Sequence, residues 1–313
     1  MTIKVYFAAG RERWPEWEAP LRAAFAACDL AVSMSPEPPR DPARVDYIIF
    51  APGGDIEDFT PYTRCKAVLN LWAGVEKIVG NPTLTQPLCR MVDPALTEGM
   101  VEYVTGHALR YHLEMHRHLQ GQDGVWRSSE LPPLARERPV AMLGIGALGA
   151  ACGRALAGLG FPVMGWSRTP REIDGLVCHS GEDGLKAVLR KAGIVVTLLP
   201  DTPQTRNLIN AERLALLPEG AYLINPGRGP LIDDNALLAA LDSGRVAGAT
   251  LDVFRTEPLP PYHPYWHHPR ATVTPHIAAA TRPQTASRIV AENIRRGEAD
   301  QPFLHRVDRD RGY

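Results

Sequence analysis

Short apolar runs alternate with amphipathic stretches along the first third of the chain. Residues 3–9, 47–50 and 67–71 form apolar runs of strand length, and an amphipathic stretch over residues 14–28 separates the first two. Apolar residues then recur at spacings of three and four between residues 97 and 119, which predicts one long helix with a single buried stripe. This alternation favours an α/β unit.

Residues 121–138 are polar and contain proline, which predicts a loop, and the alternation resumes after them. Strands are predicted over residues 139–143, 163–166, 194–199, 221–225, 247–253 and 272–274. Helical segments lie between these strands, and Gly160, Gly193 and Gly244 stand where helices would end. A final helix is predicted over residues 283–296. Such repetition is typical of a doubly wound parallel sheet.

Composition narrows the class of protein. A chain of 313 residues corresponds to about two domains. Hydrophobic residues make up 45% and charged residues 22%, as in globular proteins. The 34 basic and 35 acidic residues leave a net charge of −1, so the chain has no general attraction for nucleic acid or for an anionic membrane. We expect neither as a partner.

Cysteine content and the N-terminal sequence bear on the compartment. The five cysteines form no C-x-x-C pair, and their odd number favours reduced thiols over a disulfide framework. The first residues lack the long apolar region of a signal peptide, and no apolar stretch approaches the ~20 residues that span a bilayer. These features predict a cytoplasmic protein.

A G-x-G-x-x-G sequence runs from Gly144 to Gly149, after a predicted strand and at the start of a predicted helix. In such a loop the first glycine makes a tight turn, the second lets the backbone approach a pyrophosphate, and the third lets helix pack on strand. The helix N-terminus adds free N–H groups and a partial positive charge. We therefore expect Gly144, Gly146, Ala147 and Leu148 to bind a dinucleotide; a glycine turn without a ligand is the alternative.

The end of the next predicted strand indicates which dinucleotide. An NAD enzyme would carry Asp or Glu there for the ribose hydroxyl, but this chain has Ser167, Arg168 and Thr169. The two hydroxyl groups can donate hydrogen bonds to a 2′-phosphate, and the guanidinium can pair with it through two N–H groups. We expect NADP(H), with NAD(H) bound more weakly. The alternative is an exposed arginine that contacts nothing.

Polar and glycine-rich stretches follow four more predicted strands, at the edge where open α/β sheets bind ligands. Arg228, between two glycines, is suited to gripping a carboxylate. His276 is a natural proton donor because histidine titrates near neutral pH, and Glu257 could orient its imidazole and favour the charged form. These groups fit reduction of a 2-oxoacid. Taken singly, Arg228 could be solvated, His276 structural and Asp252 a helix cap.

At these stretches the chain resembles the D-isomer-specific 2-hydroxyacid dehydrogenases. The resemblance covers nearly the whole chain and rests on Leu199-Pro200-Asp201-Thr202-Pro203-Gln204-Thr205, Asn225-Pro226-Gly227-Arg228-Gly229, Leu251-Asp252-Val253, Glu257-Pro258-Leu259 and Thr274-Pro275-His276.

The resemblance implies that Arg228, Glu257 and His276 are the catalytic residues and that Asp252 lies by the nicotinamide. It also implies that Arg228 and the backbone N–H groups of one turn bind the substrate carboxylate. That turn consists of Trp72, Ala73, Gly74 and Val75. The further cofactor-binding residues are expected to be Leu199, Pro200, Thr205, Asn225, Pro226 and Gly227.

Two positions depart from the pattern common in that family. Pro226 and Gly227 precede Arg228 where relatives often have a non-proline residue and alanine, so the local backbone is expected to be stiffer. Trp72 stands in the substrate turn where smaller residues are frequent. It either narrows the pocket or packs beneath the loop.

The resemblance further implies two doubly wound parallel-sheet domains. A Rossmann NAD(P)-binding domain over residues 105–280 would be inserted into a flavodoxin-like substrate domain made of residues 1–104 and 281–313. The implied activity is NADPH-dependent reduction of small 2-oxoacids, glyoxylate to glycolate and hydroxypyruvate to glycerate, by a homodimer. Two alternatives stay open: an NAD(P)H-sensing regulator of the same fold without catalysis, and a dehydrogenase for a different 2-hydroxyacid.

Histidines crowd the predicted helix over residues 97–119. His112 and His116 have the i, i+4 spacing of a metal pair, but the intervening residues do not complete an H-E-x-x-H motif and no third ligand is evident. We therefore expect no metal site.

Overall fold

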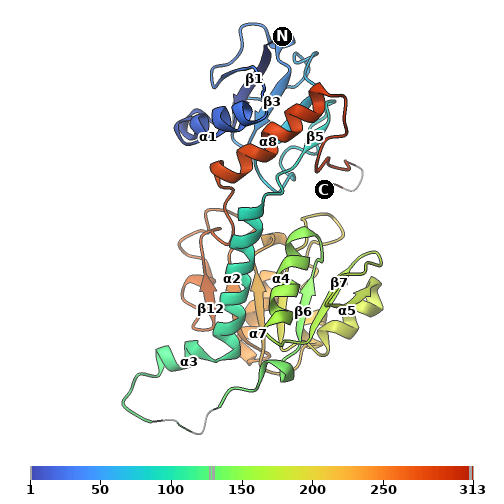
Figure 1. Cartoon of the computed structure of the whole chain (residues 1–313). Helices are drawn as coiled ribbons and strands as arrows, with labels where there is room; N and C mark the ends of the chain where they lie inside the picture. Colours follow the sequence, from blue (N-terminus) through green and yellow to red (C-terminus); the bar gives the residue numbers. More distant parts are fainter. Residues whose placement is uncertain (1, 127, 129–130, 310–311, 313) are drawn as a thin grey trace. The chain divides into compact units, whose positions relative to one another are not determined.

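The computed structural model of the chain describes residues 2–126, 128, 131–309 and 312 (Figure 1). It divides into two compact units, unit 1 with Met1–Leu96 and Ala280–Tyr313, and unit 2 with Thr97–Ala279. We predicted a first boundary after residue 104. In the structure the division falls instead within helix α2 (Pro94–His112), since this one helix belongs to unit 1 at its first residues and to unit 2 over the rest.

Unit 1 contains a sheet of five strands in the order β2-β1-β3-β4-β5, and every neighbouring pair is parallel. This is the flavodoxin-like order. The strands are β1 (Ile3–Ala8), β2 (Val32–Ser35), β3 (Tyr47–Phe50), β4 (Ala67–Asn70) and β5 (Leu88–Cys89). The sequence pattern missed β2 and β5, because β2 is half polar and β5 has only two residues.

Both faces of this sheet are covered by apolar side chains. On one face, α1 (Trp14–Ala27) and α8 (Pro283–Glu298) pack against each other and bury Leu21, Phe25 and Ile294 with the strands. The segments between strands cover the other face and bury Phe59 and Ile78. The C-terminal helix thus completes a core that the N-terminal residues begin, which is why the unit is discontinuous in sequence. Short 3₁₀ helices, η1 (Arg11–Arg13) and η2 (Pro42–Arg44), lie in the connections.

Unit 2 contains a sheet of seven parallel strands in the order β12-β11-β10-β9-β6-β7-β8. The strands are β6 (Val140–Leu143), β7 (Val163–Ser167), β8 (Val177–Ser180), β9 (Ile194–Thr197), β10 (Ala221–Asn225), β11 (Val246–Leu251) and β12 (Ala271–Val273). The chain order reverses between β6 and β9, which is the place where doubly wound sheets bind ligands. The predicted fold class, two parallel α/β sheets, is confirmed.

The helices α3 and η3 precede the first strand of unit 2, and the others lie between its strands in sequence (Figure 1). These helices are α3 (Met115–Gln120), α4 (Ala147–Gly158), α5 (Gly181–Leu189), α6 (Ala211–Ala215) and α7 (Asp234–Ser243), with short 3₁₀ helices η3 (Ala135–Glu137), η4 (Gly229–Leu231) and η5 (Pro264–Trp266). Gly244 ends α7 with a left-handed φ of 81°, as predicted for a helix-ending glycine.

The prediction of one long helix over residues 97–119 was wrong. α2 ends at His112, Glu114 adopts a left-handed φ of 52°, and α3 starts at Met115. The physical reason is that the buried stripe does not continue, since Met115 is 46% exposed and Leu119 is 71% exposed.

No helix in the described ranges is long and apolar enough to cross a membrane. In the same ranges, no three His, Cys, Asp or Glu side chains lie where they could hold a metal ion. His107, His112 and His116 lie instead against aromatic rings. His112, which is 6% exposed, meets the edge of Phe161 at 4.9 Å, and His116 meets Tyr111 at 5.6 Å between ring centroids.

Acid is expected to destabilise unit 2 through His112. Burial, with Arg138 as the second cause, lowers the pKa of His112 below its ordinary value. The unfolded chain then binds a proton more readily than the folded chain, so this contribution to stability is present above the unfolded pKa of about 6.5 and is lost as the pH falls. His112→Gln, which cannot titrate, should flatten the fall in unfolding free energy between about pH 7 and pH 5 in urea titrations. An unchanged slope would contradict this.

Candidate active site

The glycine loop follows β6 directly and leads into α4. Gly144 has a positive φ of 101°, and a Cβ there would lie 2.4 Å from the carbonyl oxygen of Leu198. A Cβ on Gly149 would lie 1.8 Å from the carbonyl oxygen of Gly144. A Cβ on Gly146, at the N-cap of α4, would meet no atom within 4 Å. Two glycines therefore close the loop, and the third leaves open space at a helix N-terminus, as a bound pyrophosphate requires.

The end of β7 places the three residues that we expect beside a 2′-phosphate. Ser167 is 9% exposed, and its hydroxyl donates to the carbonyl oxygen of Thr169 at 2.7 Å. This bond closes a tight turn and presents Arg168 on the exposed surface. No carboxylate stands in the run from Trp166 to Thr169.

The loop after β9 neighbours the glycine loop. It begins at Leu198, whose carbonyl oxygen faces Gly144. The hydroxyl of Thr205 donates to the carbonyl oxygen of Pro200 at 2.6 Å and accepts the N–H of Thr202 at 2.9 Å. The predicted cofactor residues Leu199, Pro200 and Thr205 therefore belong to one closed loop at the switch point of the sheet.

Arg228 lies in the loop after β10, which the buried side chain of Asn225 holds together. The amide nitrogen of Asn225 donates to the carbonyl oxygen of Arg228 at 3.0 Å, and its amide oxygen accepts the hydroxyl of Thr197 at 2.7 Å and the N–H of Gly227 at 3.2 Å. A Cβ on Gly229 would lie 2.0 Å from the carbonyl carbon of Phe254. The Arg228 loop is thus pressed against the segment that leads to Glu257.

Glu257 and His276, distant in sequence, form one hydrogen-bonded pair. One carboxylate oxygen of Glu257 lies 2.8 Å from Nδ1 of His276, and the other accepts the N–H of Phe254 at 2.8 Å. The carboxylate is therefore fixed at both oxygens, and a proton on Nδ1 is directed at it. The other ring nitrogen, Nε2, is left for proton transfer, and the imidazole is 53% exposed.

The carboxylate of Asp252 holds the turn that carries His276. It is fully buried and accepts the hydroxyl of Thr274 at 2.6 Å and the N–H groups of Ile277 and Ala278 at 2.9 Å each. Its carbonyl oxygen also accepts the N–H of His276 at 2.8 Å, and His276 adopts a left-handed φ of 55°. In the described chain, Asp252 thus holds the turn that carries His276.

Tyr103 extends this network to α2. Its hydroxyl lies 2.6 Å from the hydroxyl of Thr274, which donates to Asp252, so the tyrosine must donate to Thr274. Burial raises the pKa of Tyr103, which keeps the phenol protonated. Thr274 was predicted only as part of a motif, and Tyr103 was not predicted. The signal that could have found Tyr103 is an aromatic hydroxyl next to the apolar stripe of an amphipathic helix.

The turn Trp72–Val75 lies in unit 1, one residue after the end of β4. The indole of Trp72 is 38% exposed, and the guanidinium of Arg13 lies 5.8 Å from its ring centroid. Arg13 is itself held by the carbonyl oxygen of Ala9 at 2.7 Å. The indole of Trp72 therefore contacts a cation that is itself hydrogen-bonded within unit 1.

The chain belongs to the D-isomer specific 2-hydroxyacid dehydrogenase family, whose NAD binding domain matches residues 105–278. It is 41% identical over 256 residues to glyoxylate/hydroxypyruvate reductase A of Yersinia enterocolitica, covering 79% of this chain and 82% of that protein.

Two solved structures extend the comparison over the whole chain. A D-isomer specific 2-hydroxyacid dehydrogenase from Xanthobacter autotrophicus, in complex with NADPH and MES, is 40% identical, with a TM-score of 0.93 and 100% coverage of both chains. An NADPH-dependent glyoxylate/hydroxypyruvate reductase from Sinorhizobium meliloti, in complex with NADP and sulfate, is 35% identical, with a TM-score of 0.87 and coverage of 100% and 99%.

Two glycine substitutions separate folding from cofactor binding. Gly149→Ala should lower the melting temperature, because its Cβ would collide with backbone. Gly146→Ala adds a methyl group in open space and should leave the melting temperature nearly unchanged, yet weaken NADPH binding by ~10-fold or more because the methyl group occupies the approach of the pyrophosphate. Calorimetry and a fluorescence titration with NADPH measure both. Equal effects of the two variants on both quantities would contradict the assigned roles.

Proposed function

We propose that the chain is an NADPH-dependent reductase of small 2-oxoacids such as glyoxylate and hydroxypyruvate. The observation that carries this proposal is the hydrogen-bonded pair of Glu257 and His276, because the segment that leads to Glu257 packs against the loop of Arg228. The named activities of the relatives from Yersinia and Sinorhizobium support it. The glycine loop at the switch point fits the dinucleotide, which when bound supplies the hydride.

The residues of the chain then divide the remaining work. Arg228 pairs with the substrate carboxylate, and the N–H groups of the turn at Trp72–Val75 bind it as hydrogen-bond donors. Protonated His276 donates the Nε2 proton to the ketone oxygen, which becomes the hydroxyl of the 2-hydroxyacid. Glu257 holds the imidazole in orientation and stabilises its charge before that transfer.

Substitution of the pair tests this mechanism. His276→Ala should lower the turnover of glyoxylate by about 10²- to 10⁴-fold, while NADPH still binds. Glu257→Gln loses one of its two acceptor oxygens, so it cannot accept from both Phe254 and His276, and turnover should fall by ~10-fold or more. Absorbance at 340 nm gives the rates. An active His276→Ala would overturn the mechanism, and tight NADPH binding without turnover of any small 2-oxoacid by the wild type would favour the regulator.

Selectivity for NADPH over NADH is assigned to Ser167, Arg168 and Thr169. The lack of an acid in this exposed turn supports the assignment, as do the NADPH and NADP bound in the two solved relatives. Leu199, Pro200, Thr205, Asn225, Pro226 and Gly227 are proposed to line the rest of the cofactor site. Asp252 is proposed to act there by holding the histidine turn beside the nicotinamide.

Arg168→Ala should weaken NADPH binding by roughly 10- to 150-fold and leave NADH binding nearly unchanged, because only NADPH carries the phosphate that the guanidinium would grip. Arg171→Ala, at another exposed arginine three residues further on, is the matched control and should change neither. Titrations of both dinucleotides by intrinsic fluorescence measure the constants. Equal losses for the two dinucleotides would remove Arg168 from this role.

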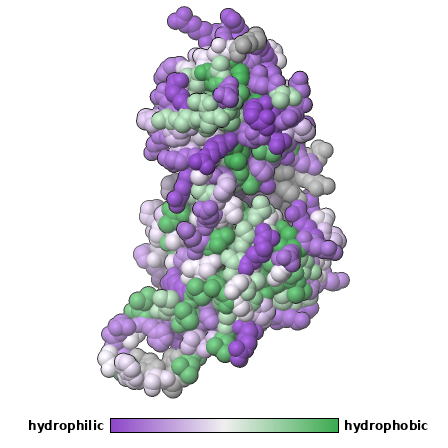
Figure 2. Space-filling model, in the orientation of Figure 1, coloured by the Kyte–Doolittle hydropathy of each residue, from purple (hydrophilic) through white to green (hydrophobic). Residues whose placement is uncertain are grey.

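A homodimer, built largely on unit 2, is proposed from its exposed apolar surface. α3 and the segment after it carry Leu119 at 71%, Trp126 at 91% and Leu131 at 83% exposure. Figure 2 shows apolar side chains among polar ones at this end of the unit. Exposed apolar side chains of this size are candidates for burial against a partner. Sedimentation velocity should give the mass of a dimer at micromolar concentration, and a monomer would contradict the proposal.

A cytoplasmic location is also proposed, since the five cysteines are free thiols.

A further inference from the structure

A buried amide stands directly beneath the turn Trp72–Val75. Asn70, the last residue of β4, is 2% exposed. Its Nδ2 group donates to the carbonyl oxygen of Trp72 at 2.8 Å and to that of Gly74 at 2.9 Å. Its Oδ1 is buried and has no hydrogen-bond partner among the described atoms. Within the described residues, the Asn70 side chain therefore bonds only to these two carbonyl oxygens.

Those two bonds fix the direction of two N–H groups. The peptide bonds of the turn are trans, and the C=O and N–H of a trans peptide unit point in opposite directions. The carbonyl of Trp72 belongs to the same peptide unit as the N–H of Ala73, and the carbonyl of Gly74 to the same unit as the N–H of Val75. Because Asn70 draws both carbonyls toward itself, it turns both N–H groups away from β4.

The rest of the turn has the same polarity. The hydroxyl of Thr281 donates to the carbonyl oxygen of Leu71 at 2.8 Å, and the N–H of Met91 donates to that of Trp72 at 3.0 Å. The N–H groups of Ala73, Gly74 and Val75 donate to no atom in the part of the chain that the structure describes. The N–H groups of Ala73 and Val75, turned away from Asn70, are therefore available as donors to an anion.

We propose that Asn70 is a positioning residue for the substrate carboxylate. It holds the carbonyls of Trp72 and Gly74 inward, so that the N–H groups of Ala73 and Val75 face the carboxylate of a 2-oxoacid. The inference rests on the proposed function and adds a specificity determinant that lies outside the turn itself. Asn70 touches neither substrate nor cofactor in this role.

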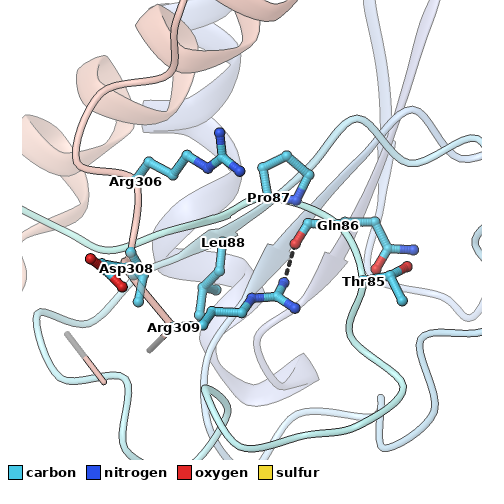
Figure 3. Close-up of a pocket in the computed structure, with 8 residues that line it drawn as sticks. Thr85, Gln86, Pro87, Leu88, Arg306, Asp308 and Arg309 are labelled. Carbon is cyan, nitrogen blue, oxygen red and sulfur yellow. Dashed lines mark hydrogen bonds between the residues drawn. The ribbon is translucent and has the colours of Figure 1, made fainter. Parts of the chain in front are cut away.

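The structure offers a matched control for a purely structural effect. Gln86, in the same unit, is 9% exposed and its Nε2 donates to the carbonyl oxygens of Phe59 at 3.4 Å and Tyr62 at 3.1 Å, while its Oε1 has no partner within the described residues. Gln86 lines a cavity of about 490 Å³ next to Arg309, which donates to the Gln86 carbonyl oxygen (Figure 3). It has the same chemistry as Asn70 but no connection to the turn.

The experiment compares Asn70→Leu with Gln86→Met, two apolar replacements of similar size. Both should lower the melting temperature. Only Asn70→Leu should raise KM for glyoxylate, by ~10-fold or more, with a smaller change in kcat and with the Kd of NADPH within about twofold of wild type. Calorimetric titration of oxalate into the enzyme–NADPH complex should show the same loss without any turnover. Asn70→Ser, which is smaller and keeps a hydroxyl, gives the test if the leucine variant does not fold.

The outcomes separate this inference from the proposed function. If the wild type turns over no 2-oxoacid, the proposed function fails. If the wild type is active and Asn70→Leu or Asn70→Ser keeps the wild-type KM and oxalate affinity, Asn70 is structural only and the inference is overturned. A rise in KM of equal size in Gln86→Met would overturn it as well, because a general softening of unit 1 would then be the cause.

Discussion

Several buried strands end in a polar residue, and the site depends on the hydrogen bonds that these residues must form. Asn70, Ser167, Thr197 and Asn225 are the last residues of β4, β7, β9 and β10, and each is at most 9% exposed. A buried polar group without a partner costs about 1–3 kcal/mol. Asn70, Ser167 and Asn225 therefore donate to backbone carbonyls of the loop that follows, and Thr197 donates to Asn225. The core of each sheet thereby shapes the loops that carry the chemistry.

The same constraint orients His276. β11 is followed by Asp252, whose buried carboxylate needs donors and finds them in Thr274, Ile277 and Ala278. Because these residues flank His276, the turn is fixed on both sides of the imidazole. Glu257 then has only to fix the ring itself, which it does from an exposed position. A buried network that fixes the turn and an exposed carboxylate that fixes the ring thus support the same side chain.

The sequence predicted the fold class and the strands that are apolar throughout, because burial on both faces of a parallel sheet leaves a continuous apolar run. It missed β8, whose residues are partly exposed and which lies at the sheet edge. It also predicted one helix where α2 and α3 are separate, since spacing alone does not reveal that Met115 and Leu119 face outward. Periodicity predicts that a helix has an apolar face. Whether that face is buried depends on which other element packs against it, and the spacing of residues does not indicate this.

The site residues were predictable to the extent that their chemistry is carried by the side chain. Arg228, Glu257 and His276 are reactive or charged groups in a recognisable order, and the structure brings Glu257 and His276 into contact. The turn Trp72–Val75 differs, because the role proposed for it rests on backbone N–H groups, which every residue except proline possesses. What distinguishes it is the residue that orients them. Asparagine is depleted in strands, so its presence at the end of the apolar run before Trp72 was a local conflict with the predicted element. Such a conflict at a strand end indicates a side chain that stabilises the following loop rather than the strand. A site built from backbone groups can therefore be recognised in the sequence by the polar residue that orients them.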